Sequence, residues 1–209
     1  NLNIKQEPFF STFFSLSSHP PYNLPENYTT SVNKKIGIKE TIKYTDHSMR
    51  EFFKKVKNQK WFRNTVFIIT ADHTASTNYN KKYKNKIGRY AIPLIIFKGD
   101  STLKGINTNI VQQIDVMPTI LKMINYQKSY FAFGKSMFDE SWGANFLNNE
   151  YRLITDNQII INKSENYSSF SDWSTSQKVK IDNDYEDLLK AIKQDYNNRM
   201  TNNNLLYEN

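Results

Sequence analysis

The feature that most constrains the fold is an apolar, β-branched run that ends abruptly in an acid and a histidine. Residues 65–70 read TVFIIT, and Asp72 and His73 follow one residue later. A continuous apolar run of this length predicts a strand buried on both faces of a parallel sheet. Ligands of open α/β sheets bind beyond the carboxyl ends of such strands, so the pair is a candidate site for a divalent cation. The alternative for the pair alone is a loop in which Asp72 caps a helix and His73 is exposed.

A second apolar run, PFFSTFFSL at residues 8–16, predicts another buried strand. The sequence SSHPP follows it and places His19 just beyond the strand end, where Pro20 and Pro21 stop the strand. A lone histidine after a strand is more often structural than catalytic. Two buried strands that each end in a histidine favour a shared site.

An amphipathic helix is predicted over residues 37–57, because apolar residues recur there at spacings of three and four. A strand, a long helix and a second strand form a βαβ unit, which implies a parallel sheet with a right-handed crossover. Asp46 and His47 form a second Asp-His pair inside this helix. Neighbouring helix positions point about 100° apart, so we interpret His47 as structural or exposed.

The segment after Asp72-His73 is polar and rich in lysine. The cluster at residues 81–86 is either a solvated loop or a cationic rim that attracts a phosphate-bearing substrate. Arg89 precedes an apolar strand predicted at residues 94–97. Its guanidinium can bind an oxyanion bidentately or form a structural ion pair.

The rest of the chain predicts a helix with Asp115 as its N-cap, a β-hairpin that turns at Asp156-Asn157, and a final amphipathic helix. These elements cover residues 115–124, 151–155 with 158–163, and 184–200. We expect an α/β fold: a mixed, mostly parallel sheet flanked by helices, with a small β-hairpin plus helix as a tail. The expected division is residues 1–140 and an appendage, 141–209, that packs on them.

Composition narrows the possible classes of protein. The 209 residues suit one α/β domain with an appendage, and the absence of cysteine excludes disulfides, thiol catalysis and Cys-ligated zinc. The net charge of +8 is dispersed, with no basic recognition helix and no aromatic platform motif, so we expect no nucleic-acid partner. No stretch reaches the roughly 18 apolar residues of a membrane span. The chain opens at Asn1 in a polar segment without an initiator Met, so we interpret it as a piece of a longer protein.

Several of these segments together carry a resemblance to a known family. They are PFFSTFFSLSSHPPYNLP (8–25), YTDHSMREFF (44–53), NTVFIITADHT (64–74), GRYAIPLIIF (88–97), QQIDVMPTIL (112–121) and FAFGKSMF (131–138). In this order and spacing they resemble the carboxyl-terminal half of a sulfatase-superfamily catalytic domain. The branch they are most similar to is the lipoteichoic acid synthase-like group of membrane-anchored bacterial enzymes, related to phosphoethanolamine transferases.

The resemblance implies an alkaline-phosphatase-like fold and one divalent cation, Mn²⁺ or Mg²⁺, with Zn²⁺ in some relatives. Asp72 and His73 correspond to metal ligands of the family's D-H motif. His19 corresponds to the histidine of the S-H-x-P motif, which contacts the substrate phosphate or the leaving group. Arg89 lies near the site in the resemblance and is a candidate substrate-binding residue.

The family's nucleophile and a further acidic metal ligand lie well upstream of the S-H-x-P motif. Only 18 residues precede His19, and none has the family's nucleophile context, since Thr12 lies within the predicted strand. We therefore expect that this chain alone carries half of a site, binds metal weakly and turns over nothing.

The function implied is that of a metal-dependent enzyme fragment that transfers or hydrolyses phosphate or sulfate esters of envelope lipids or glycans through a covalent hydroxyl-enzyme intermediate. Without the nucleophile residue, the sequence does not distinguish a phosphotransferase from a sulfatase. The alternative is a non-catalytic envelope-binding module with the same fold. The implied partners are the amino-terminal half of the same protein and a membrane reached through an anchor outside this chain. The implied location is the bacterial envelope, with the parent protein anchored in the inner membrane and this domain periplasmic or extracellular.

Overall fold

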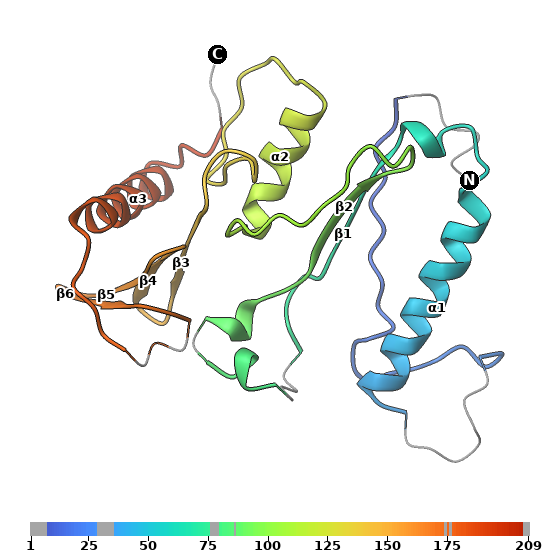
Figure 1. Ribbon diagram of the computed structural model, residues 1–209, viewed down its shortest axis with the longest axis horizontal. Coiled ribbons are helices and arrows are strands. Elements are labelled where there is room, and N and C mark those ends of the chain that lie inside the picture. The colour runs from blue at the N-terminus through green and yellow to red at the C-terminus, as the bar shows by residue number, and fades with distance from the viewer. Residues whose placement is uncertain are drawn as a thin grey trace. The chain divides into compact units, whose positions relative to one another are not determined.

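The computed structural model describes residues 8–28, 36–75, 80–85, 87–173, 175 and 177–206. The chain divides into two compact units (Figure 1). Unit 1 comprises Asn1–Thr70 and Leu94–Lys104, and unit 2 comprises Ala71–Pro93 and Gly105–Asn209. Each unit has its own sheet.

Unit 1 is built from helix α1 (Ile38–Val56) and the strands β1 (Val66–Thr70) and β2 (Leu94–Lys98). All three elements were predicted from the sequence and are confirmed. The ring of Phe53 on α1 lies 5.4 Å from those of both Phe67 and Phe97. The apolar face of α1 therefore packs on one face of the strand pair through aromatic contacts.

The direction of strand pairing in unit 1 differs from the prediction. β1 pairs with β2 in antiparallel fashion, and residues 8–16 are extended without belonging to a strand. The predicted parallel βαβ unit is therefore wrong for the described residues. An apolar run signals burial but carries no information on the direction of its neighbour. The side chains of Phe10 and Phe13 are 80% and 90% exposed, so this run lacks the burial that its composition predicts.

Unit 2 contains a four-stranded antiparallel sheet in the order β3-β4-β5-β6. Its strands are Trp142–Leu147, Glu150–Thr155, Ile159–Lys163 and Asn166–Phe170. The predicted hairpin is confirmed as β4 and β5, whereas β3 and β6 were not predicted. Helix α3 (Asn183–Thr201), which was predicted, covers one face of this sheet (Figure 1).

The core of unit 2 has two layers because the strand side chains alternate between the faces of the sheet. Leu153 and Ile160 point to the α3 side and pack with Leu189 of that helix. Ile159 and Ile161 point to the other side and pack with Ile87, which belongs to the segment after Asp72-His73. This second layer connects the carboxyl-terminal sheet to the candidate site.

Helix α2 (Val116–Met123) was also predicted, with Asp115 as its N-cap residue. Asp115 does occupy that position, but its side chain makes no capping bond to α2. Instead it closes the preceding 3-10 turn, Gln113–Asp115, by accepting the backbone N–H of Gln112 at 2.8 Å.

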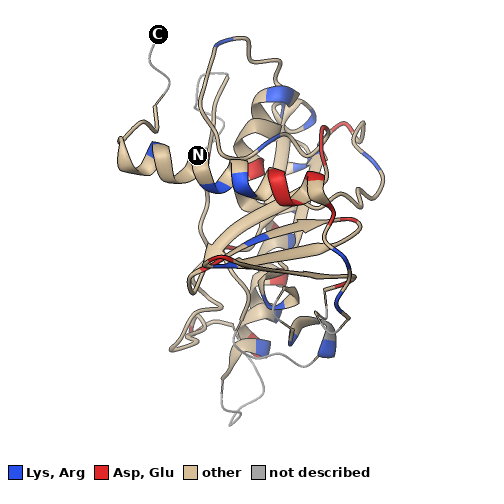
Figure 2. Ribbon diagram, turned by 90° about the vertical axis from the view of Figure 1, so that its left-hand side faces the viewer, with Lys and Arg blue, Asp and Glu red and all other residues tan. Residues whose placement is uncertain are grey.

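Both signs of charge occur along α3, as Figure 2 shows. Lys190 pairs with Glu186 at 2.8 Å and Arg199 pairs with Asp195 at 3.0 Å, so this helix presents no basic face. Among the described residues, none of the helices is both long enough and apolar enough for a membrane span.

Candidate metal and substrate site

Asp72 and His73 lie in a short loop directly after β1, and we call residues 71–74 the site loop. Oδ1 of Asp72 accepts the backbone N–H of His73 at 2.9 Å. Oδ2 of Asp72 lies 3.5 Å from Nε2 of His73. Nδ1 of His73 lies 2.8 Å from the carbonyl oxygen of Thr74, which favours the tautomer with its proton on Nδ1.

These two side chains fit the ligand chemistry of a divalent cation. Two donors bound to Zn²⁺ at about 2.1 Å with a tetrahedral angle between them lie about 3.4 Å apart. The 3.5 Å between Oδ2 of Asp72 and Nε2 of His73 is close to that value. A bond from the second ring nitrogen to a backbone carbonyl is the usual arrangement for a metal-binding histidine. Both side chains are exposed, so they are open to a ligand.

The pair alone supplies only two ligands. Within the described residues there is no cluster of three or more His, Asp or Glu side chains suited to a metal ion. Structural zinc sites use four protein ligands and catalytic zinc sites use three. Asp72 and His73 therefore fit part of a cation site.

Neighbouring side chains hold the site loop from two directions. The side-chain Nε2 of Gln113 donates to the carbonyl oxygens of Ala71, at 2.9 Å, and Asp72, at 2.7 Å. On the other side, Thr74 Oγ1 donates to the carbonyl oxygen of Arg89 at 2.6 Å. The backbone on both sides of His73 is thereby fixed.

Arg89 lies close to the site loop through its own backbone. It belongs to the 3-10 turn Gly88–Tyr90, whose start is formed by Asn85: Oδ1 of Asn85 accepts the backbone N–H groups of Ile87 and Gly88. Ile87 is buried against the sheet, while the Arg89 side chain is exposed with its guanidinium 5.4 Å from the centre of the Tyr90 ring. The structure therefore places the Arg89 backbone beside the site loop that carries Asp72 and His73. The Arg89 guanidinium forms no ion pair with another described residue.

His19 lies in unit 1, in a turn that follows the extended residues 8–16. Its backbone N–H donates to the carbonyl oxygen of Leu16 at 3.1 Å, and its Nδ1 lies 2.7 Å from the carbonyl oxygen of Pro20. The neighbouring Ser18 hydroxyl lies 3.4 Å from that of Thr45 on α1, which ties the turn to the helix. The exposed ring can therefore present Nε2 to a ligand.

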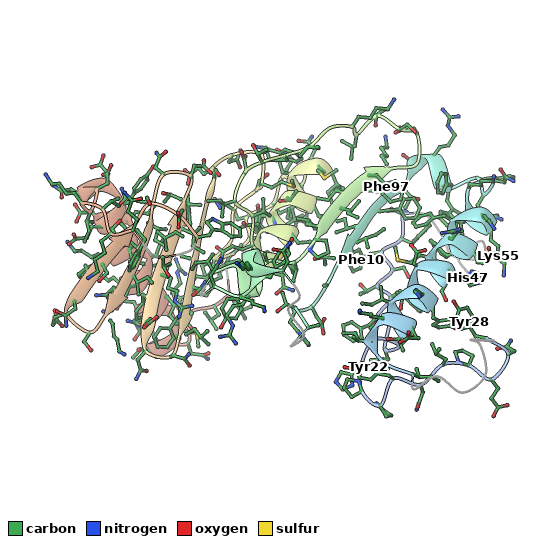
Figure 3. All side chains as sticks on the ribbon, turned by 60° about the horizontal axis from the view of Figure 1, so that its bottom comes forward. Phe10, Tyr22, Tyr28, His47, Lys55 and Phe97 are labelled. Carbon is green, nitrogen blue, oxygen red and sulfur yellow. The ribbon has the colours of Figure 1, made fainter. Side chains whose placement is uncertain are left out.

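The second Asp-His pair behaves as predicted. Asp46 forms an ion pair with Arg50 at 3.2 Å, and the ring of His47 lies 5.7 Å from that of Tyr28. Figure 3 labels both rings, which lie beside each other in unit 1. His47 is exposed, and Asp46 is directed to a different partner.

Gln113, Thr74 and Asn85 are site-supporting residues that sequence reasoning missed. Each acts through one hydrogen bond or two to a backbone group, and no spacing rule identifies such bonds. The spacing of Gln112 and Asp115 did carry a usable signal, because a residue three positions into a turn can close a capping box with the residue that starts it.

Comparison with solved structures defines the fold class. The chain superimposes on a protein of the alkaline phosphatase superfamily from Vibrio parahaemolyticus with a TM-score of 0.80 and 22% identity, covering 99% of this chain and 52% of that one. It superimposes on the lipoteichoic acid synthase LtaP from Listeria monocytogenes with a TM-score of 0.69 and 19% identity, covering 93% and 54%. The predicted alkaline-phosphatase-like α/β fold is thereby confirmed, although the sheets within this chain are antiparallel.

Sequence comparison then gives the family. The family model described as Sulfatase matches residues 2–126, and the chain belongs to this family. It is 27% identical over 215 residues to lipoteichoic acid synthase 1 of Bacillus subtilis (strain 168), covering 90% of this chain. It is 26% identical over 185 residues to lipoteichoic acid synthase of Staphylococcus aureus (strain USA300), covering 76% of this chain. The chain spans 32% and 28% of the lengths of these two relatives.

Proposed function

We propose that this chain is the carboxyl-terminal part of a metal-dependent phosphotransferase that acts on phosphate esters of envelope lipids or glycans. The observation that carries the proposal is the placement of Asp72 Oδ2 and His73 Nε2, 3.5 Å apart at the end of β1, in a chain of the sulfatase family. The names of the relatives, lipoteichoic acid synthases, support an envelope substrate and a transfer reaction.

Asp72 and His73 would hold a divalent cation, Mn²⁺ or Mg²⁺, with Zn²⁺ as the variant in some relatives. Such a cation supplies Lewis-acid polarisation of a phosphoryl oxygen and lowers the pKa of a nearby hydroxyl. The protein's own contribution at this point is orientation. The Thr74 carbonyl sets the ring of His73, and the Asp72 carboxylate is fixed by the His73 backbone N–H.

His19 and Arg89 act on the substrate in this proposal. The Nδ1 of His19 faces the Pro20 carbonyl, so Nε2 is the nitrogen that donates a proton or hydrogen bond to a substrate oxygen. A positioned acid of this kind contributes roughly 10²- to 10⁴-fold to the rate. The planar guanidinium of Arg89 suits two parallel hydrogen bonds to a phosphate or sulfate.

The nucleophile and the remaining cation ligands are proposed to lie in an amino-terminal part of the same polypeptide. The exposed side chains of residues 8–16 support this, because four large apolar groups there are solvent-accessible: Phe10, Phe13, Phe14 and Leu16. A strand with both faces covered would bury them, so they suit a sheet that includes further chain. The same polypeptide would carry the membrane anchor and place the domain at the outer side of the cell membrane.

The test compares two proteins, this chain and a longer polypeptide that includes the amino-terminal part. Each is assayed with Mn²⁺ on a chromogenic phosphodiester and on a chromogenic sulfate ester. We expect no turnover by this chain alone and phosphodiester turnover by the longer protein, with His19→Asn lowering kcat by roughly 10² or more. The matched control is His47→Asn, which alters an exposed histidine outside the site.

Each result discriminates between alternatives. Turnover by this chain alone would place the nucleophile within it. Preference for the sulfate ester would replace the phosphotransferase by a sulfatase. A longer protein that binds Mn²⁺ but turns over neither ester would favour the non-catalytic envelope-binding module.

A further inference from the structure

We propose that Gln113 is a positioning residue for the site loop, and that Gln112 couples the same turn to the carboxyl-terminal sheet. The proposal rests on the proposed metal site for its functional meaning. The two adjacent glutamines point their amides at different backbones, so one short turn links the sheet of unit 2 to Asp72 and His73.

The contact of Gln113 with the site loop uses both protons of its amide. Nε2 donates to the carbonyl oxygen of Ala71 at 2.9 Å and to that of Asp72 at 2.7 Å. These carbonyls belong to successive peptide groups, so a single side chain fixes the orientation of the peptides that lead into and out of Asp72. The second of those peptides also carries the N–H of His73 that holds the Asp72 carboxylate.

Gln112 binds the sheet in the way that a neighbouring strand would. Its Nε2 donates to the carbonyl oxygen of Ala144 at 2.6 Å, and its Oε1 accepts the N–H of Ala144 at 2.9 Å. Ala144 lies in β3, the strand at one edge of the four-stranded sheet. The side chain therefore satisfies both backbone groups of an edge residue and fixes the turn to that edge.

The turn that carries both glutamines is itself rigidly held. The buried carboxylate of Asp115 accepts the backbone N–H of Gln112 at 2.8 Å through Oδ2 and that of Lys135 at 2.9 Å through Oδ1. Thr119 Oγ1 donates to the Asp115 carbonyl at 2.6 Å and accepts the N–H of Met137 at 3.0 Å. Because this turn is rigidly held, the Gln113 side chain can restrain the position of the site loop. A glutamine on a mobile loop could not do so.

The experiment replaces each glutamine by methionine, which is neutral and similar in length but has no N–H donor. Gln113→Met removes the contact with the site loop, and Gln112→Met removes the contact with β3. The matched control is Gln127→Met, because Gln127 also donates two bonds, to the carbonyl and the side-chain oxygen of Asn125, but within its own turn. Gln113→Glu is a second variant at the key position, since its carboxylate keeps the shape and cannot donate.

The two readouts are amide hydrogen exchange at residues 71–74 and the affinity for Mn²⁺ measured by electron paramagnetic resonance. We expect Gln113→Met and Gln113→Glu to speed exchange in the site loop, and Gln113→Met to weaken Mn²⁺ binding about tenfold, as loss of outer-shell partners does. Gln112→Met should speed exchange at Ala144 and, to a lesser extent, in the site loop. Gln127→Met should change neither readout.

The two readouts separate failure of this inference from failure of the proposed function. If the unaltered protein binds no Mn²⁺ while Gln113→Met still speeds exchange at residues 71–74, the metal site is wrong and the positioning role stands. If Mn²⁺ binds and neither Gln113 variant alters exchange or affinity, the positioning role is wrong. Faster exchange at Ala144 without any change in the site loop would overturn the coupling by Gln112.

Discussion

The carboxylate of Asp115 lies 3.6 Å from the ammonium of Lys135 and also accepts the backbone N–H of Lys135 at 2.9 Å. The Asp115 side chain is 1% exposed and that of Lys135 14% exposed. Lys135 in turn donates to the carbonyl oxygen of Trp142 and lies 4.2 Å from the centre of its ring. This pair joins the start of α2, the segment after it and the first strand of the sheet.

Replacing Asp115 should therefore destabilise the protein strongly. Asp115→Ala leaves a largely buried ammonium without its partner and two backbone N–H groups without their acceptor. Breaking a buried pair in this way costs about 3–5 kcal/mol in the free energy of unfolding, measured by urea denaturation. Asp139→Ala is the control, because Asp139 pairs with Lys122 where both side chains are about half exposed, and its loss should cost less than about 1 kcal/mol. Equal costs for the two variants would contradict the role given to Asp115.

A glycine at position 134 is required by a close backbone approach. A Cβ there would lie 2.1 Å from the carbonyl oxygen of Ile114, which belongs to the turn that carries Gln113. Gly134→Ala must therefore displace backbone, and we expect it to lower the free energy of unfolding by about 3 kcal/mol. Gly37→Ala is the control, since the nearest atom to its Cβ is a flexible side-chain oxygen of Glu40 at 3.7 Å. A thermal unfolding temperature unchanged by Gly134→Ala would show that this approach does not constrain the fold.

The carboxyl of Asp100, in the turn after β2, should have a measurably lowered pKa. Hydrogen bonds from Lys98 and then from Thr102 lower the pKa of Asp100 from 3.8 to about 2. A lowered carboxyl pKa means that its stabilising contribution is fully present above pH 3.8 and is lost as the pH falls through about 2. An NMR titration of the Asp100 carboxyl should give a midpoint near 2, and Lys98→Met should raise the pKa towards 3.8. An unperturbed midpoint in the unaltered protein would rule out the ion pair at 2.8 Å as a solution feature.

The sequence predicted the long regular elements well, because these depend on local periodicity. The helices α1 and α3, the strands β1 and β2 and the hairpin of β4 and β5 all carry clear apolar patterns. β3 was missed because its sequence, WGANFL, contains a glycine and an asparagine that weaken a strand pattern. β6 was missed because its sequence, NYSSF, is mostly polar, although Ser169 in it is buried and donates to Gln158.

The extended residues 8–16 show where periodicity is insufficient. Their composition predicts a strand buried on both faces, yet a strand also requires partners for its backbone, and sequence pattern does not supply the identity of those partners. The antiparallel direction of the β1–β2 pair was not predicted for a similar reason. Pairing direction depends on the path of the chain between the two strands and not on the apolar run itself.

The sequence predicted which residues of the candidate site could bind a metal, but not the hydrogen bonds that support them. An acid and a histidine at a strand end are visible in the sequence. The structure adds that Oδ2 of Asp72 and Nε2 of His73 lie 3.5 Å apart. The supporting bonds of Gln113 and Thr74 were not predictable, because each depends on backbone carbonyls that only the folded chain brings within reach. His19 and its role in the same site stay predictions from sequence.

The most direct test of the central claim is Mn²⁺ binding to two matched double variants, followed by electron paramagnetic resonance. Asp72→Asn with His73→Gln removes the pair at the end of β1. Asp46→Asn with His47→Gln removes the pair on α1, which has the same residue types, is also exposed and is directed to other partners. We expect weak Mn²⁺ binding by the unaltered protein, loss of this binding in the Asp72/His73 variant and unchanged binding in the Asp46/His47 variant. Equal binding by the unaltered protein and the Asp72/His73 variant would contradict this expectation.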